Sequence, residues 1–324
     1  MNRYFDRADM AWPNRSEILR EKTVLVIGGG AFGSNFAMWF ARAGVGQLVI
    51  VDGDVVEPHN LERSSCYTEE DVGRPKVEAL ARCIRQLRHG WRTRVYPIPS
   101  YLDAEFYEKW FPKYRWVFKQ ADLYILAVDN DIARKEAGEL SCYWNVPIMD
   151  VSFGVVLGEG VGRILYFPEP RRGPCRLCFF TRRDEEAIEQ LMGYNLQATC
   201  PKCGVRFKVQ NWRWNPEVEG GRARAIKEGG KTVAVEVGCP RCGHLFTVRT
   251  PDAPAPALSE WIYVTASIAY YYAIKHLLGE RPDWNVMFIN FGSRINITAH
   301  KIAASRDHWQ RHVVRLPQSS FSAH

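Results

Sequence analysis

The sequence predicts an α/β fold: a doubly wound, mostly parallel sheet with later antiparallel strands and an inserted zinc ribbon. Three observations predict it. Strand-like and helix-like segments alternate over the first half of the chain, which is typical of parallel sheets with right-handed crossovers. Apolar and polar residues then alternate over 153–167 and 286–298, which indicates antiparallel strands. Between these two stretches the regularity fades, and three Cys-x-x-Cys pairs occur there.

A glycine-rich turn joins the first predicted strand, 24–27, to a helix. Gly28, Gly30 and Gly33 let the backbone turn tightly and approach a phosphate at the N-terminus of that helix. The next strand ends in Asp52, whose carboxylate is placed to accept hydrogen bonds from a ribose. This order of strand, turn, helix and strand predicts a nucleotide site in a Rossmann-like sheet. A glycine turn that serves only packing is the alternative.

Three charged residues farther along the chain indicate which nucleotide is bound. A nicotinamide cofactor does not require two cations such as Arg63 and Lys76 in one pocket. A triphosphate does, because its negative charge must be neutralised. Asp129 ends the strand predicted over 123–128, and a carboxylate at this edge of the sheet suits Mg²⁺. Each residue taken alone is better explained as an ordinary surface charge. Together they predict a site for ATP and Mg²⁺.

The other elements follow in order along the chain. A helix is predicted over 75–87, a strand near 94–97, a helix after Asn130 and a strand over 146–151. The expected organisation is an N-terminal segment 1–22, an ATP-binding core 23–167, an insertion with a zinc ribbon 168–256, a C-terminal helix with antiparallel strands 257–314, and a tail 315–324.

Composition favours a cytoplasmic enzyme with a full core. The chain has 324 residues, 46% of them hydrophobic, and its N-terminus is charged and polar without a signal-peptide pattern. The longest apolar stretch, 257–279, contains Glu260, Lys275 and His276. We therefore expect a buried or amphipathic helix there and no membrane span.

Six of the nine cysteines lie between Pro168 and Pro256. The two later pairs read Cys-Pro-Lys-Cys-Gly and Cys-Pro-Arg-Cys-Gly, tight turns that each direct two thiolates at one metal. Two such turns separated by a β-like stretch predict a Zn²⁺ ribbon. Disulfides are the alternative, and a cytoplasmic chain disfavours them. The predicted ligands are Cys200, Cys203, Cys239 and Cys242.

These motifs, in this order and spacing, resemble the E1-like adenylyltransferase family, which includes MoeB, ThiF and the catalytic cores of ubiquitin-activating enzymes. The resemblance covers 23–158 with interruptions and resumes over the helix near 257–279. It implies that ATP and Mg²⁺ are used to adenylate the C-terminal glycine of a ubiquitin-like or sulfur-carrier β-grasp protein. The motifs are the glycine turn, VDGD at 51–54, NLER at 60–63, DVGRPK at 71–76, and Asp129-Asn130 followed by Arg134.

The resemblance also implies residue roles. Asp52 holds the ribose, Asp129 holds Mg²⁺, and the phosphates are surrounded by Asn60, Arg63 and Lys76. Ala31 stands where many members have a further glycine, and its methyl group narrows the approach to the phosphate without forbidding it. The implied nucleotide contacts are completed by Gly28, Gly30, Ala31, Gly33, Asp54 and Asn130.

The family's chemistry needs few groups. A C-terminal carboxylate with a pKa of about 3.5 is already ionised at neutral pH, so no general base is required. An arginine near the N-terminus often reaches the neighbouring subunit's nucleotide in this family. The resemblance therefore implies a homodimer with Arg3 or Arg7 in that role, and an exposed arginine in a mobile tail is the alternative.

A second zinc site is a hypothesis. In the resembled family a Cys-x-x-Cys pair at the place of Cys175 and Cys178 shares a zinc with a C-terminal pair, which this chain lacks. His308 and His312 are four residues apart in the corresponding stretch and would share one face of a helix. We predict that these four residues bind Zn²⁺. Two solvated histidines are the alternative.

The three remaining cysteines are expected to be structural. Cys66 lies in a predicted loop, and Cys83 and Cys142 lie on predicted helices beside apolar residues. An external thiol or sulfide is therefore expected to take the activated acyl group. A nucleophilic Cys66 is the alternative.

Positive charge gathers in the insertion. Residues 171–252 hold fifteen Lys and Arg against nine Asp and Glu, an excess of six, and the whole chain has a net charge of +7. A basic ribbon fits an acidic protein or, less favoured here, nucleic acid. Two alternatives follow: adenylation of a carboxylate on modified tRNA, as in threonylcarbamoyladenosine dehydratases, and a catalytically idle nucleic-acid-binding module. Arg63, Lys76 and Asp129 argue against an idle site.

Overall fold

The computed structural model describes residues 4–87, 93–156, 159–179, 195–210, 216–228, 231–250 and 258–303. The chain forms two compact units. The first comprises residues 1–129, 133–179 and 257–324, and the second comprises 130–132 and 180–256. Each is described separately below.

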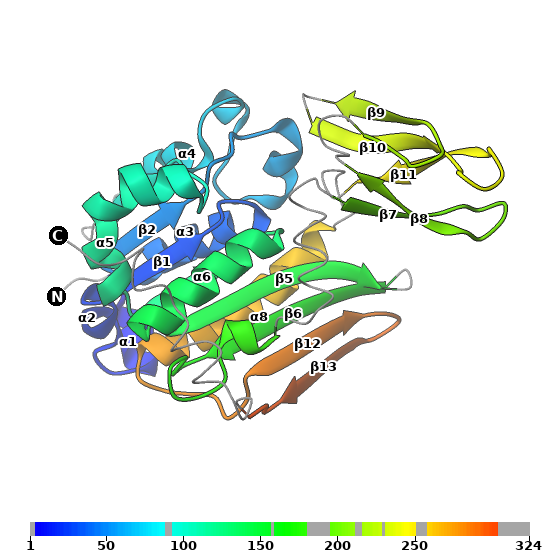
Figure 1. The fold of residues 1–324 in the computed structure, drawn as a ribbon. Coiled ribbons are helices and arrows are strands. Elements are labelled where there is room, and N and C mark those ends of the chain that lie inside the picture. Colours follow the sequence, from blue (N-terminus) through cyan, green and yellow to red (C-terminus); the bar gives the residue numbers. More distant parts are fainter. Residues whose placement is uncertain are drawn as a thin grey trace. The chain divides into compact units, whose positions relative to one another are not determined.

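An eight-stranded sheet forms the centre of the first unit, in the order β13-β12-β6-β5-β4-β1-β2-β3 (Figure 1). Neighbours from β5 to β3 pair in parallel, and β6, β12 and β13 pair antiparallel. The predicted mostly parallel sheet with later antiparallel strands is therefore confirmed. The strands are β1 Thr23–Ile27, β2 Gln47–Val51, β3 Arg94–Ile98, β4 Leu123–Leu126, β5 Ile148–Val156, β6 Glu159–Phe167, β12 Val286–Phe291 and β13 Ile295–His300.

Helices cover both faces of this sheet, because successive residues of a strand point to opposite sides. On one side Val24 and Val26 of β1 join a core cluster with residues of α3, α4 and α8. On the other, Leu25 and Ile27 join a second cluster with residues of α5 and α6. The helices are α1 Asp6–Ala11, α2 Arg15–Arg20, α3 Ala31–Ala43, α4 Lys76–Arg85, α5 Phe111–Gln120, α6 Asp131–Trp144 and α8 Ser259–Leu277, with short turns η1 Pro58–Arg63, η2 Glu69–Asp71, η3 Phe106–Trp110 and η4 Arg176–Phe179.

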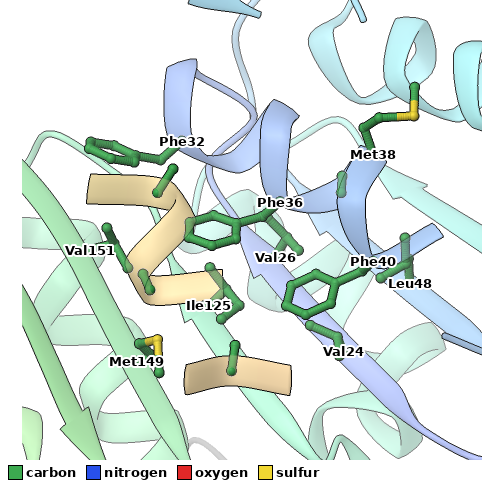
Figure 2. Packing of buried hydrophobic residues seen from close by; sticks show 14 of the residues in the cluster. Val24, Val26, Phe32, Phe36, Met38, Phe40, Leu48, Ile125, Met149 and Val151 are labelled. Atoms are coloured by element: carbon green, nitrogen blue, oxygen red, sulfur yellow. The ribbon is translucent and has the colours of Figure 1, made fainter. Parts of the chain in front are cut away.

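Aromatic side chains of α3 fix that helix against the sheet. Phe36 and Phe40 are fully buried, and they lie over Val24, Val26 and Ile125 of the central strands (Figure 2). Burial of a phenylalanine side chain stabilises the fold by about 1.5–3 kcal/mol. This packing holds the N-terminus of α3 at the carboxyl ends of β1 and β2, which is where the candidate site lies.

Several element boundaries differ from the predicted ones. The helix predicted over 75–87 begins at Lys76, because Pro75 takes the N-cap position with a non-helical ψ, and it ends at Arg85. The strand predicted over 146–151 is β5, which continues to Val156 as one arm of a hairpin with β6. Within the described residues, no helix combines the length and hydropathy that a membrane crossing requires.

The second unit contains two small antiparallel sheets. One is the hairpin of β7 (Asn195–Thr199) and β8 (Arg206–Gln210), and the other has the order β11-β10-β9. Its hydrophobic cluster is small, with six buried residues. Those residues are Leu196, Ala198, Val209, Val218, Val235 and Val237, and the strands of the second sheet are β9 Ala223–Glu228, β10 Lys231–Gly238 and β11 Leu245–Arg249.

Candidate functional site

Two glycines of the β1–α3 turn are required by the fold itself. Gly28 has φ +97°, a conformation that side chains rarely adopt, and a Cβ atom there would lie 2.4 Å from the carbonyl oxygen of Ala127. A Cβ atom at Gly33 would lie 1.7 Å from the carbonyl oxygen of Gly28. The turn and the helix therefore approach each other at a distance that only glycine permits.

Gly30 differs from both of these glycines. Its φ of −69° is open to any residue, and a Cβ atom there would meet nothing within 4 Å. Gly30 is also the N-cap of α3, and its position carries no side-chain cap for the first N–H groups of the helix. An uncapped helix N-terminus with open space in front of it suits a phosphate.

Asp52 is held at the end of β2 by two backbone donors. The Gly29 N–H donates to Asp52 Oδ2 at 2.5 Å, and the Asp54 N–H donates to Oδ1 at 2.7 Å. Burial raises the pKa of Asp52, and the nearby ammonium of Lys76 opposes that rise. Each carboxylate oxygen keeps a lone pair, so the group can still accept hydrogen bonds from a ribose.

Lys76 is a buried cation in the same place. It is the first residue of α4, only 7% exposed, and its Nζ lies 2.8 Å from Asp54 Oδ2. Burial alone would lower the pKa of Lys76, but the carboxylates of Asp52 and Asp54 raise it above its ordinary value. The side chain therefore stays charged and is available to a phosphate.

Asp129 lies at the same edge of the sheet, shortly after β4, and its carboxylate is exposed. Its charge also contributes to the raised pKa of Lys76, so the two groups act on each other electrostatically. An exposed carboxylate has the oxygen ligands that Mg²⁺ prefers, and the residue therefore fits the predicted role. Asn130 follows it directly in the chain.

Asn60 and Arg63 are placed by separate contacts on η1. Asn60 is buried, and its Oδ1 accepts a hydrogen bond of 3.0 Å from the Glu57 N–H, which closes the turn. Arg63 is half-buried, and its carbonyl oxygen accepts a hydrogen bond of 3.0 Å from the side chain of Asn35. The structure thus joins Asp52, Asp54 and Lys76 directly and anchors the Asn60–Arg63 turn against α3.

Asn35 is a positioning residue that the sequence reasoning missed. It is fully buried on α3, where its Nδ2 donates to the Ala31 and Arg63 carbonyls and its Oδ1 accepts from the Ser65 N–H. A buried amide with three partners fixes the distance between the glycine turn and η1. An asparagine inside a helix of mostly apolar residues was the available signal.

Tyr67 and Tyr101 were also missed. The Tyr67 hydroxyl is buried and donates to the Gly29 carbonyl at 2.6 Å, which supports the glycine turn from the side of α4. The Tyr101 hydroxyl donates to Asp54 Oδ1 at 2.5 Å. Both phenols lie outside the short motifs, so no local pattern indicated them.

The predicted zinc ribbon has the geometry of a metal site. The sulfur atoms of Cys200, Cys203, Cys239 and Cys242 all lie within 4.8 Å of one another. Cys200 and Cys242 are 3.7 Å apart, and Cys203 and Cys239 are 3.6 Å apart. Tetrahedral zinc with Zn–S bonds of about 2.3 Å separates its sulfurs by about 3.8 Å. The four thiols therefore fit Zn²⁺.

The earlier cysteine pair is partly described. Cys175 and Cys178 have their sulfurs 3.8 Å apart, which is also compatible with a shared metal. Their predicted partners His308 and His312 lie outside the described residues, so that ligand set stays a prediction. Cys142 was expected to be a core residue, and it is fully buried in contact with Cys175.

Cys66 and Cys83 require a correction. The sequence suggested a loop cysteine and a separate core cysteine, with a nucleophilic Cys66 as the alternative. The structure joins the two in a disulfide, with Cα atoms 6.0 Å apart and a sequence separation of 17. Local spacing does not give cysteine connectivity, because the pairing depends on how the loop packs against α4. A disulfide-bonded Cys66 has no thiol for nucleophilic attack.

Comparison with known proteins adds a family and a fold. A family model described as the ThiF family matches residues 8–312. The sulfur carrier protein adenylyltransferase of Thermus thermophilus is 29% identical over 72% of this chain and 77% of its own length. The SAMP-activating enzyme E1 of Haloferax volcanii is 30% identical over 55% of this chain and 60% of its own length.

Other relatives are longer than this chain. The adenylyltransferase and sulfurtransferase uba4 of Emericella nidulans is 30% identical over 51% of this chain, which spans 33% of that relative. Among solved structures, E. coli MccB with ATP superposes with a TM-score of 0.61 over 94% of this chain and 73% of its own. At 14% identity that likeness shows the fold alone.

Proposed function

Because this chain belongs to the ThiF family, we propose that it uses ATP to adenylate the C-terminal glycine carboxylate of a small ubiquitin-like or sulfur-carrier protein, with release of pyrophosphate. One observation carries the proposal. A buried lysine, Lys76, stays charged beside Asp52 and Asp54, next to a helix N-terminus that faces open space at Gly30. The names of the Thermus and Haloferax relatives support the class of substrate.

The proposed positions of the nucleotide follow from these contacts. The α-phosphate region approaches Gly30 and the first N–H groups of α3, and the ribose binds to Asp52. Lys76 leaves Asp54 and pairs with phosphate oxygens, with Arg63 as a second cation from η1. Asp129 would hold Mg²⁺, which supplies further positive charge at the pyrophosphate.

The reaction is an in-line displacement at the α-phosphate. A carboxylate oxygen of the substrate forms a bond to the α-phosphorus, and the bond to the bridging oxygen breaks as pyrophosphate leaves. No proton is moved, because a terminal carboxyl with a pKa of about 3.5 is already ionised. Lys76 and Arg63 bring the two anions together and stabilise the charge that develops on the leaving group.

The cysteines support an acceptor outside the chain. Four are gathered in the ribbon, and Cys66 is bonded to Cys83. Zinc bound to the ribbon would supply folding energy to a unit whose hydrophobic cluster, among the described residues, has only six buried members. The acyl-adenylate is therefore proposed to react with an external thiol or sulfide.

In the proposed homodimer, Arg7 at α1 is the candidate to reach the neighbouring nucleotide, and Arg3 lies outside the described residues.

One observation favours a second candidate, adenylation of a carboxylate on modified tRNA. The hairpin of β7 and β8 contains no Asp or Glu, and it exposes Lys202, Arg206 and Lys208. Gln197 lies directly opposite Lys208 across the two strands. Basic and amide side chains on one face are suited to phosphate contacts. The same face also fits an acidic protein.

ATP–pyrophosphate exchange distinguishes the candidates. Exchange that requires a small protein ending in Gly-Gly supports the leading proposal, and exchange that requires tRNA supports the second. Asp129→Ala should abolish exchange while leaving the zinc content unchanged, because Asp129 and the ribbon cysteines are separate sites. Absence of exchange with every carboxylate tested, despite a normal zinc content, would contradict both candidates.

A further inference from the structure

Tyr101 is an exposed aromatic residue whose ring is nevertheless held in one position. It follows β3, and 55% of its surface is exposed. Its hydroxyl donates to Asp54 Oδ1 at 2.5 Å. Its ring lies against Gly53 so closely that a Cβ atom there would be 2.7 Å from two ring carbons. One face of the ring therefore lies against the Gly53 backbone, while more than half of the residue's surface stays exposed.

The strand order sets the direction of a bound nucleotide. Along the sheet the order is β4, β1, β2, β3, with all four strands parallel and about 4.8 Å between neighbours. Asp129 follows β4, the glycine turn follows β1, and Asp52 follows β2. If the phosphates bind at the end of β1 and the ribose binds at the end of β2, the base lies toward the end of β3. Tyr101 lies in the segment that follows β3, three residues after the strand ends at Ile98.

We propose that Tyr101 forms the base-stacking surface of the nucleotide site, with the purine ring of ATP lying on its open face. This inference rests on the proposed function, since it assumes that the site binds ATP. A flat aromatic ring held at one end and on one face loses little freedom when a base stacks on it. The stacking subsite therefore adds affinity through the base, separately from the phosphate contacts.

Asp54 connects the base subsite to the phosphate subsite. Its Oδ1 accepts from the Tyr101 hydroxyl, and its Oδ2 contacts Lys76. Burial and then the hydrogen bond to Asp54 raise the pKa of Tyr101, so the phenol remains a donor at neutral pH. When Lys76 turns to the phosphates, the Tyr101 hydroxyl still holds the Asp54 carboxylate. The ring thus keeps its position in the loaded site.

Calorimetric binding of two ligands tests the proposal on the whole protein. ATP reports base and phosphate contacts together, and inorganic tripolyphosphate reports the phosphate contacts alone. Tyr101→Ala should weaken ATP binding by about 10-fold, the usual loss for a base deprived of its stacking partner, and leave tripolyphosphate binding within about 2-fold. Tyr101→Phe keeps the ring and should retain most of the ATP affinity. Tyr271→Ala is the control, since Tyr271 is 54% exposed on α8.

Three results would overturn the inference. ATP binding that Tyr101→Ala leaves unchanged shows that the ring is not a base contact. An equal loss in Tyr101→Ala and Tyr101→Phe assigns the effect to the hydroxyl, and an equal loss for ATP and tripolyphosphate assigns it to the phosphate subsite. If the unaltered protein binds tripolyphosphate but not ATP, the proposed function fails as well. That outcome is distinct from the first three, in which ATP still binds to the unaltered protein.

Discussion

The ammonium group of Lys76 lies 2.8 Å from the carboxylate of Asp54 in the proposed nucleotide site. The lysine side chain is 9% exposed and the aspartate side chain 38% exposed, so solvent reaches the aspartate far more than the lysine. An anionic ligand that reaches Lys76 must therefore compete with Asp54 for the same cation. The pairing keeps the lysine charged and correctly placed before the ligand arrives.

Replacing Lys76 by alanine should reduce ATP–pyrophosphate exchange by at least about 100-fold, because the leaving pyrophosphate loses one of the two cations proposed to stabilise it. Lys76→Arg should restore part of the rate, since the charge returns with a different shape. Lys135→Ala, on an exposed part of α6, is the matched control and should leave exchange unchanged. A Lys76→Ala protein that folds normally and exchanges at more than a tenth of the normal rate would contradict the assignment.

Asn35→Ala should lower the free energy of unfolding by about 2 kcal/mol, because it leaves the Arg63 carbonyl and the Ser65 N–H without their buried partner. ATP affinity should fall with it, since η1 is no longer fixed to α3. Ser34→Ala is the control at the adjacent position, where the hydroxyl makes a single long hydrogen bond of 3.4 Å. Urea denaturation measures both variants. Equal losses of stability would argue against a special role for Asn35.

The stability of the protein should fall as the pH drops below about 6.5, the pKa of histidine in an unfolded chain. Burial lowers the pKa of His276 in the folded protein, and its ring contacts the Tyr166 hydroxyl and the Asp122 carbonyl. In the window below 6.5 the unfolded chain therefore binds more protons than the folded one. Denaturation midpoints between pH 7.5 and 5.5 should show the loss, and His276→Gln should reduce it. An unchanged slope in that variant assigns the pH dependence to other groups.

Zinc content should separate the two cysteine sites. Metal analysis of the intact protein should give two zinc ions per chain, and His308→Ala with His312→Ala should reduce that number to one. Cys239→Ser should remove the ribbon zinc and loosen the second unit, because the part of its hydrophobic cluster that the structure describes has only six buried residues. ATP binding should persist in that variant. A count of two after both histidines are replaced would contradict their role as ligands.

The sequence predicts the parts of this structure that depend on local order. Gly28, Asp52 and Asp129 each follow a predicted parallel strand, and the carboxyl ends of parallel strands must meet at one edge of the sheet. The ribbon is equally local, since each Cys-x-x-Cys turn fixes two ligands by itself. The predicted placement of these strand ends agrees with the observed sheet, and the predicted ribbon agrees with the observed distances between the thiols.

Contacts between distant residues could not be predicted in this way. Asn35 reaches Arg63 across 28 residues, and Tyr101 reaches Asp54 across 47. The Cys66–Cys83 disulfide is of the same kind, because it depends on how a loop lies on α4. The end of β5 was missed for a related reason: it is set by pairing with β6 rather than by its own residues.

Gly30 and Gly33 should differ in the substitutions that they tolerate. Any side chain at 33 collides with the Gly28 carbonyl, whereas a methyl group at 30 meets only open space. In a library of all single substitutions, selection for folded protein alone should remove every substitution of Gly33 and retain substitutions of Gly30. Selection for the ATP-dependent activity should remove the substitutions at both positions. The difference between the two tolerance maps would mark the surface reserved for the phosphate without a ligand ever being observed there.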